Sequence, residues 1–206
     1  MKIIVFGLWL TLGTYSFCWA QLTQTDTLLA DIGVNQLPDL LPSKMLFTQR
    51  AVWGSRGLVR NWRPLTIQNR QSELKIRRNM LKIHRFVGLT TLAGMVGQGF
   101  LGAKLYRNYS SSLKNSHENM ALGINITYTT AALLSLTAPP PMVRRKGFSG
   151  VKLHRGLAIL HLSGMIATNV LARKISDNPS LKPYHRAAAY TTFAAMTVSV
   201  VSLKFK

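Results

Sequence analysis

The sequence predicts an all-α membrane protein: a four-helix transmembrane bundle built from two repeated helical hairpins and preceded by a signal peptide and a basic extramembrane arm. Three observations predict this fold. Four long windows contain no charged residue, the segment that begins at Lys82 recurs from Lys152, and Lys and Arg outnumber Asp and Glu by 26 to 6. The formal net charge of +20 argues against an acidic disordered chain, and it leaves an anionic membrane face, nucleic acid or an anionic cofactor as candidate partners.

Residues 1–20 are typical of a secretory signal, with Lys2 as the charged start and an apolar run over 3–12. We expect cleavage after Ala20. The alternative, an uncleaved anchor helix, needs about 20 apolar residues, and the run is interrupted from Gly13 onward. Cleavage would remove Cys18, the single cysteine of the chain. The mature chain would then have no disulfide, iron–sulfur cluster, cysteine zinc site or covalently attached haem.

Residues 21–80 are polar and basic and are interrupted by Pro38, Pro42 and Pro64. We expect an extramembrane arm with one or two short helices, followed by the membrane domain over 81–206. Four windows without charge follow one another in that domain: Phe86–Ala103, Asn119–Val143, Gly156–Ala172 and Ala187–Leu203.

Lys or Arg flanks every window, and no consistently polar face runs along any of them, which favours helices surrounded by lipid and protein. Snorkelling basic side chains extend even the shorter windows toward the roughly 20 residues that a bilayer requires. The alternative is a soluble four-helix bundle with unusually apolar helices. Pro139, Pro140 and Pro141 are expected to end the second helix. The first window also has five glycines that would allow close helix packing: Gly88, Gly94, Gly97, Gly99 and Gly102.

An internal repeat relates the two halves of the membrane domain. Residues 82–95 and 152–165 match at six of fourteen positions, including a Lys-x-His-Arg start and a Gly-Met end. The second and fourth windows follow His117 and His185, which are separated by nearly the same interval as the two repeated segments. The chain is therefore predicted to contain two copies of one helical hairpin. Met95 and Met165 end the repeated segment, and we expect them to pack in the core.

Four of the five histidines stand at the N-terminal end of a predicted span, one for each span: His84, His117, His154 and His185. Because consecutive spans run in opposite directions, His84 and His154 share one membrane face, and His117 and His185 share the other. Two inward-facing histidines on alternate helices suit the two axial positions of a haem iron, which then exchanges electrons and has no open position for oxygen. The pattern predicts two such haems. For any single histidine, the alternative is an interfacial or capping residue.

Arg85, Arg155 and Arg186 each follow a candidate ligand directly. Arginine suits carboxylates, so these three residues are predicted to pair with haem propionates. His161 lies seven residues after His154, about two turns deeper on nearly the same helix face. We expect His161 to be a hydrogen-bonding or proton site near a haem, or an alternative ligand to His154, with the supporting role favoured over ligation.

The order and spacing of these four histidines resemble those of the cytochrome b561 family over about residues 82–205. The glycine in His84-x-x-x-Gly88 is also similar to that family's pattern. The resemblance implies two haems b, one bound by His84 and His154 and the other by His117 and His185. It also implies transmembrane electron transfer between a redox donor and an acceptor, alone or as part of a membrane oxidoreductase.

Two other functions stay open at this point. One is a haem-free four-helix membrane subunit whose basic arm docks on a partner complex or on anionic lipid. The other is a secreted nucleic-acid binder, which requires the windows to be soluble helices. The leading interpretation predicts the lipid bilayer and redox proteins as partners, with a further protein on the arm, and no nucleic acid. The windows contain no Asp or Glu, which argues against a proton-coupled transporter and a di-iron carboxylate site.

The orientation in the membrane has two conflicting signals. Twelve basic residues flank the face where the first and third spans begin, against seven on the other face. The positive-inside rule places the richer face in the cytoplasm, whereas a cleaved signal leaves the arm and the same face outside. We expect the signal to dominate. The prediction is a multi-pass protein of a bacterial inner membrane, with the arm outside the cytoplasm.

Overall fold

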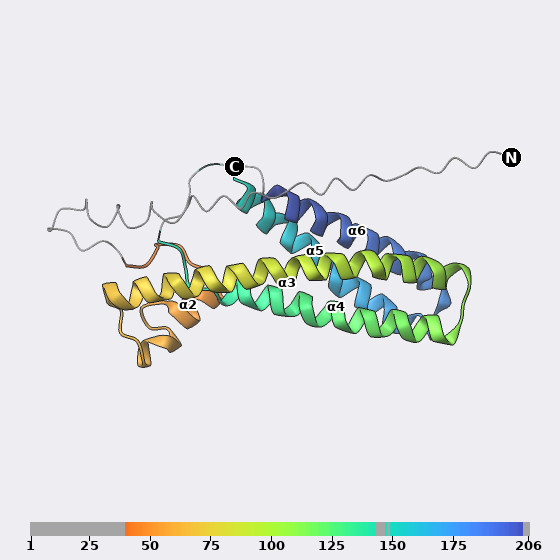
Figure 1. Ribbon diagram of the computed structural model, residues 1–206, viewed down its shortest axis with the longest axis horizontal. Helices are drawn as coiled ribbons and strands as arrows, with labels where there is room; N and C mark the ends of the chain where they lie inside the picture. Colours follow the sequence, from red (N-terminus) through yellow and green to blue (C-terminus); the bar gives the residue numbers. More distant parts are fainter. Residues whose placement is uncertain (1–39, 143–146, 148, 204–206) are drawn as a thin grey trace, which may run out of the picture. The chain divides into compact units, whose positions relative to one another are not determined.

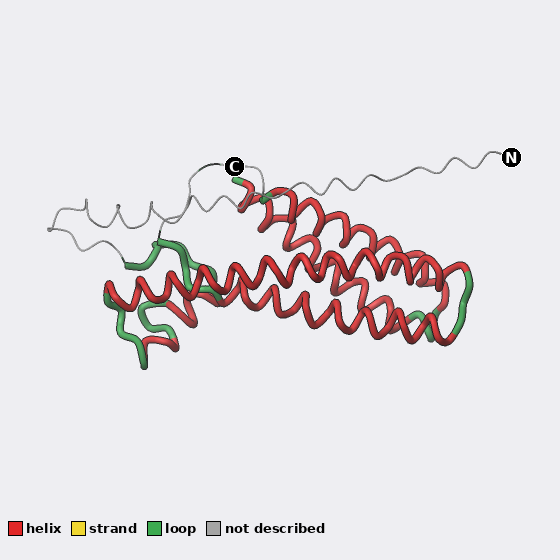
Figure 2. The backbone as a smooth tube through the Cα atoms, in the orientation of Figure 1, coloured by secondary structure: helices red, strands yellow, loops and turns green. Residues whose placement is uncertain are grey.

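All regular secondary structure in the described part of the chain is helical (Figures 1 and 2). The computed structural model describes residues 40–142, 147 and 149–203. The predicted signal peptide with Cys18, and the basic triplet 144–146, lie outside these residues. The elements are α2 (Phe47–Trp53), the 3-10 helix η1 (Leu58–Asn61), α3 (Ile67–Arg107), α4 (Ser111–Thr137), α5 (Gly150–Lys174), the 3-10 helix η2 (Pro179–Leu181) and α6 (Lys182–Ser202).

Three of these helices, α3, α4 and α5, are long and apolar enough to cross a membrane. They contain the first three predicted windows. The fourth window lies in α6, which has 21 residues but does not reach the same apolar standard, because Thr, Ser and Ala fill much of its sequence. The all-helical fold is thus confirmed for the described residues, and three of the four predicted spans have the character of membrane helices.

The ends of the long helices follow from local sequence. Thr66, Ser110 and Ser149 precede α3, α4 and α5, and each side chain accepts a hydrogen bond from a backbone N–H in the first turn. Such caps satisfy amide groups that have no partner inside the helix. At the other end of α4, the helix stops at Thr137, just before the run of prolines, as predicted.

α3 is much longer than a single span. Its 41 residues extend over about 60 Å, whereas the hydrocarbon core of a bilayer is about 30 Å thick. The predicted boundary between the arm and the membrane domain, after residue 80, lies inside this helix. The helix is continuous there because no Pro or Gly occurs from Ile67 to Val87. The last part of the predicted arm, 67–80, is therefore helix. Residues 40–66 of the arm contain α2 and η1, which are the short helices that were expected.

The membrane domain consists of two hairpins, in which α3 packs along α4 and α5 packs along α6 (Figure 1). Equivalent residues make a close approach in each hairpin. A Cβ atom at Gly94 would lie 3.1 Å from Ile124, and one at Gly164 would overlap the hydroxyl of Thr192. Gly164 is the repeat equivalent of Gly94, and Thr192 lies as far beyond His185 as Ile124 lies beyond His117. The sequence repeat is therefore also a repeat of packing.

The other glycines of the first window divide into two groups. Gly97 and Gly102 face α4, where an added Cβ atom would lie 3.4 Å from Met120 and 3.0 Å from His117. Gly88 and Gly99 have no neighbour within 4 Å of such an atom. The expectation of close packing was therefore wrong for Gly88 and Gly99. Each lies one helical turn from Leu92 or Met95, on the side of α3 that faces the other hairpin, and the two hairpins approach each other less closely than the helices within each hairpin.

The two hairpins meet more loosely than the helices within each hairpin. Between them, Cα atoms of the described helices come within 8 Å of each other only where α3 meets α6. Side chains from both hairpins meet in one buried cluster between them. The buried cluster there contains Ile124, Tyr128, Met165 and Met196, with Leu92 and Met95 packed against it. Met95 and Met165 are therefore core residues, as expected.

The outward faces of the bundle are strongly apolar. Phe86, Phe100 and Ile159 have exposed fractions of 72%, 74% and 71%, and many Leu, Ile and Val residues on the same helices are also exposed. Soluble proteins rarely present such continuous apolar surface to water. Together with the three apolar helices, this surface indicates a multi-pass membrane protein in contact with lipid.

Candidate functional site

The four predicted ligand histidines come together in two pairs. The ring centroids of His84 and His154 are 6.1 Å apart with an interplanar angle of 89°. Those of His117 and His185 are 6.4 Å apart with an angle of 72°. All four side chains are half-buried. The pairing expected from helix alternation is thus the pairing that the structure has.

The two pairs form layers at a constant separation. His84 contacts the backbone at Ala131 and His154 contacts it at Ser199, so these four positions mark one layer. Gln98, His117, Thr168 and His185 mark the other: His185 contacts the backbone at Thr168, and the side chain of Gln98 contacts the backbone at His117. Along each of α3, α4, α5 and α6 the same interval separates the layers. It amounts to about four helical turns, or about 21 Å.

Three of the histidines are oriented by the same kind of hydrogen bond. The Nδ1 atom of His84 donates to the carbonyl of Ala131 at 2.8 Å, and that of His185 donates to the carbonyl of Thr168 at 3.0 Å. His154 Nδ1 lies 3.1 Å from the carbonyl oxygen of Ser199 and 2.8 Å from its hydroxyl. Because a carbonyl only accepts, Nδ1 carries the proton and the lone pair of a neutral ring is on Nε2. Metal-binding histidines are fixed in the same way.

His117 is the exception. Its Nδ1 atom and the Oε1 atom of Gln98 are both buried and have no hydrogen-bond partner in the described part of the chain. Gln98 donates instead from Nε2 to the backbone carbonyl of His117 at 3.0 Å. The ring of His117 is therefore held by packing, with Gly102 against its Cε1 atom, rather than by the bond that orients the other three.

The separations within the layers would allow each pair of imidazoles to hold one metal ion between them. A metal–imidazole bond of about 2.0 Å, with each ring centroid about 1.1 Å beyond the bonded nitrogen, places two axial imidazole centroids about 6.2 Å apart. The observed 6.1 and 6.4 Å agree with this sum. The angle between the two rings does not affect this distance, because each ring could rotate about its bond to the metal. Neutral imidazoles with free Nε2 atoms are suitable donors for haem iron.

The predicted propionate partners differ from one another in their surroundings. Arg85 and Arg155 are exposed, next to the first layer of histidines. Arg186, beside His185, has its guanidinium carbon 4.3 Å from the ring centroid of Tyr106 and 5.7 Å from that of Tyr190. Both contacts are cation–π interactions, and the one with Tyr106 connects the end of α3 to the start of α6. No sequence pattern pointed to Tyr106, because contact across two helices has no fixed spacing.

His161 does not face another histidine. Its Nδ1 atom lies 2.7 Å from the hydroxyl of Tyr128, with the two ring centroids 5.6 Å apart. On α5 it is seven residues from both His154 and Thr168, and so midway between the layers. His161 thus has a hydrogen-bond partner in buried Tyr128, and its supporting role near a haem stays a prediction. It also joins α4 to α5 across the space between the hairpins.

A second polar contact joins the same two helices and was not anticipated. The side-chain amides of Asn125 and Asn169 donate to each other, at 2.9 and 3.0 Å. Asn169 also donates to the carbonyl of Met165 at 2.8 Å. Such reciprocal amide pairs stabilise helix contacts inside membranes. Neither residue stood out in the sequence, since a lone Asn in an apolar window does not show which helix it faces.

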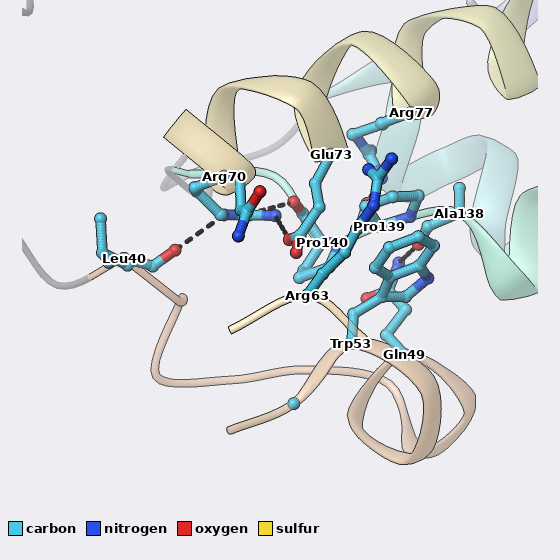
Figure 3. Close-up of polar contacts among 12 residues, drawn as sticks. Leu40, Gln49, Trp53, Arg63, Arg70, Glu73, Arg77, Ala138, Pro139 and Pro140 are labelled. Carbon is cyan, nitrogen blue, oxygen red and sulfur yellow. Dashed lines mark hydrogen bonds and ion pairs between the residues drawn. The ribbon is translucent and has the colours of Figure 1, made fainter. Parts of the chain in front are cut away.

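The arm is attached to the membrane domain by a buried charge cluster (Figure 3). Glu73 is fully buried and forms ion pairs with Arg60 and, at 2.9 Å, with Arg70. Arg70 also donates to the carbonyls of Leu40 and Pro140. Burial lowers the pKa of Arg70, and the Glu73 carboxylate opposes this effect. One carboxylate thus compensates two guanidinium groups and connects the arm, α3 and the segment after α4.

No family model, curated protein or solved structure matches the chain. The candidate site consists of two histidine pairs, one in each layer, with three of the four rings oriented by main-chain carbonyls.

Proposed function

We propose that the chain is a membrane cytochrome of the b561 type that binds two haems b and passes electrons from one membrane face to the other. The observation that carries the proposal is the pair of histidine layers about 21 Å apart along every helix of the bundle. Two layers at this separation lie within a hydrocarbon core of about 30 Å, each near one of its boundaries. Haem iron with two imidazole ligands supplies one-electron chemistry at each boundary.

The residues of the chain have separate roles in this proposal. His84 and His154 hold one haem, and His117 and His185 hold the other. The carbonyls of Ala131, Ser199 and Thr168 keep three of the rings in the tautomer that leaves Nε2 free. Arginine side chains beside three of these ligands compensate the propionates: Arg85, Arg155 and Arg186.

The placement in the membrane belongs to the same proposal. α6 is the fourth span, because it runs beside α5 over the whole distance between the two layers and is about 30 Å long. The arm lies outside the cytoplasm of a bacterium, after a cleaved signal peptide. The electron donor and acceptor then meet the protein on opposite faces of the inner membrane.

The test is a dithionite-reduced minus oxidised spectrum of the detergent-purified protein, with the haem counted per chain as the pyridine haemochrome. We expect sharp low-spin b-type bands and two haems per chain. His84→Ala and His117→Ala should each remove one haem, because each opens a different layer. His161→Ala is the matched control, since it also removes a half-buried histidine from the bundle but leaves both pairs intact.

Other results would contradict the proposal in different ways. Absence of haem after expression with ample haem supply would favour the haem-free subunit that docks on a partner complex. Loss of both haems in either single variant, with the folded helical content unchanged, would mean that the layers are not separate sites. One haem in the unmodified protein would show that one of the two pairs is misassigned.

A further inference from the structure

The segment 44–63, here called the collar, contains α2 and η1 and is fixed to the end of α4. Thr48 donates to the carbonyl of Leu136 at 2.6 Å, Gln49 to that of Ala138 at 3.1 Å, and Trp53 to that of Thr137 at 2.7 Å. The last carbonyls of a helix have no partner inside it. The collar supplies these partners, so its position along α4 is set by three bonds (Figure 3 shows Gln49 and Trp53 beside Ala138).

This position coincides with the edge of the apolar surface. Leu133 and Leu136 on α4 are 55% and 41% exposed, so lipid-facing side chains continue up to the residues that the collar contacts. Ala131, which marks the first histidine layer, is five residues from Leu136, or about 7.5 Å along the helix. Arg77 of α3 bonds the carbonyl of Pro139 at this same level. The collar therefore lies at the edge of the exposed apolar surface of α4.

The outer face of the collar combines large apolar and basic side chains. Phe47 is 84% exposed, Leu58 64% and Trp62 78%. No Asp or Glu occurs from residue 40 to 66. Of the five basic residues in that range, only Arg60 points inward, to Glu73. The other four are exposed: Lys44, Arg50, Arg56 and Arg63.

Aromatic residues with interspersed Lys and Arg are the side chains that stabilise a protein at the membrane interface. The apolar rings enter the boundary between acyl chains and head groups, and the basic groups contact lipid phosphates. A segment of this composition that was not fixed to the bundle could bind a soluble protein as readily as a membrane. The collar differs because its bonds to α4 already hold it at the level of the lipid surface.

We propose that the collar is a lipid-binding site for the anionic head groups of the leaflet that surrounds the first histidine layer. Its ligand is the phosphate-bearing lipid next to α4, held by Arg56 and Arg63 and by insertion of Trp62. The site is independent of haem, because none of its residues belongs to either histidine layer. An acidic protein that binds the same charges is the competing occupant.

The experiment places the full chain in nanodiscs, with one environment-sensitive fluorophore at residue 62 through Trp62→Cys in a Cys18→Ser background. Trp62 is 78% exposed, so this substitution removes little packing within the protein. The matched control is Ser72→Cys. Ser72 is an exposed residue of α3 that precedes Arg77 by five residues, which places it about 7.5 Å farther from the membrane along the helix. Quenching by lipids that carry a quencher near the head group is measured for both labels.

We expect quenching at residue 62 to exceed quenching at residue 72 by at least about twofold in discs that contain phosphatidylglycerol. The excess should fall when phosphatidylcholine replaces that lipid, and also when Arg56→Gln and Arg63→Gln are combined. Equal quenching at the two positions would overturn the proposal. So would an excess that is the same in both lipids and in the double variant, since the anionic head group would then have no part in it.

Discussion

Glu73→Gln is the substitution that most directly tests how the arm is held. The Glu73 side chain has no exposed surface, and its partners Arg60 and Arg70 are only 8% and 2% exposed. Glutamine keeps the size of the side chain but removes its charge. Two guanidinium groups would then remain buried without a counter-charge, because the described part of the chain places no other carboxylate beside them.

The magnitude follows from the cost of leaving a buried charge unpaired. Removing one partner of a buried ion pair costs about 3–5 kcal/mol. The cluster can relieve this cost by detaching α2 and η1 from α3 and letting Arg60 reach water. The free energy of local opening should therefore fall by about this amount. At about 1.4 kcal/mol per factor of ten, the open population should rise by about two to three and a half orders of magnitude.

Hydrogen exchange of the collar amides measures this population. The amide of Arg50 donates to the carbonyl of Leu46 at 2.8 Å and that of Gly54 to the carbonyl of Arg50 at 3.0 Å, at the two ends of α2, so their exchange reports detachment and fraying of that helix. Glu118→Gln is the matched control, because its pair with Lys114 is exposed and should leave exchange in the collar unchanged. If Glu73→Gln changed the exchange of these amides no more than the control, the carboxylate would not hold the arm and the reasoning would be refuted.

Two further substitutions test the bundle. Gly164→Ala places a Cβ atom on the hydroxyl of buried Thr192, so α5 and α6 must separate at a cost of about 1–3 kcal/mol, and the Tm should fall. Gly156→Ala is the control, because the added Cβ atom has open space there and should not lower the Tm. An unchanged Tm for the first variant would contradict the packing. His161→Gln should retain both haems and low-spin bands, because His161 bonds Tyr128 rather than facing a histidine; loss of a haem would identify it as a ligand.

The pairing of the histidines was predictable because it depends only on features that run along the chain. Alternating helix direction fixes which residues share a membrane face, and the repeat fixes which share a depth. Neither requires knowledge of how each helix is rotated. The start of α3 was predictable in principle too. The segment from Ile67 to Phe86 has helix-forming residues and no Gly or Pro, but its charge led to the expectation of an arm that ends at residue 80.

The contacts between helices were not predictable for a physical reason. Successive residues of a helix are rotated by about 100°, so an apolar window without a polar face does not show which residue meets which neighbour. Tyr128 and His161 are 33 residues apart, and Asn125 and Asn169 are 44 apart. Glu73 has Arg70 at a visible helical spacing, but its contact with Arg60 depends on how the chain turns back after η1.

The repeat builds two layers of similar geometry, and single residues then make them different. His154 has both the carbonyl and the hydroxyl of Ser199 at its Nδ1 atom, whereas His117 has no partner there within the described residues. Hydrogen bonds to the outer nitrogen of a ligating imidazole raise its basicity and so alter the potential of the metal. Two haems held in these layers would therefore differ in potential although their ligands are the same. Such a difference would give electron transfer a preferred direction, which a strictly symmetric repeat lacks.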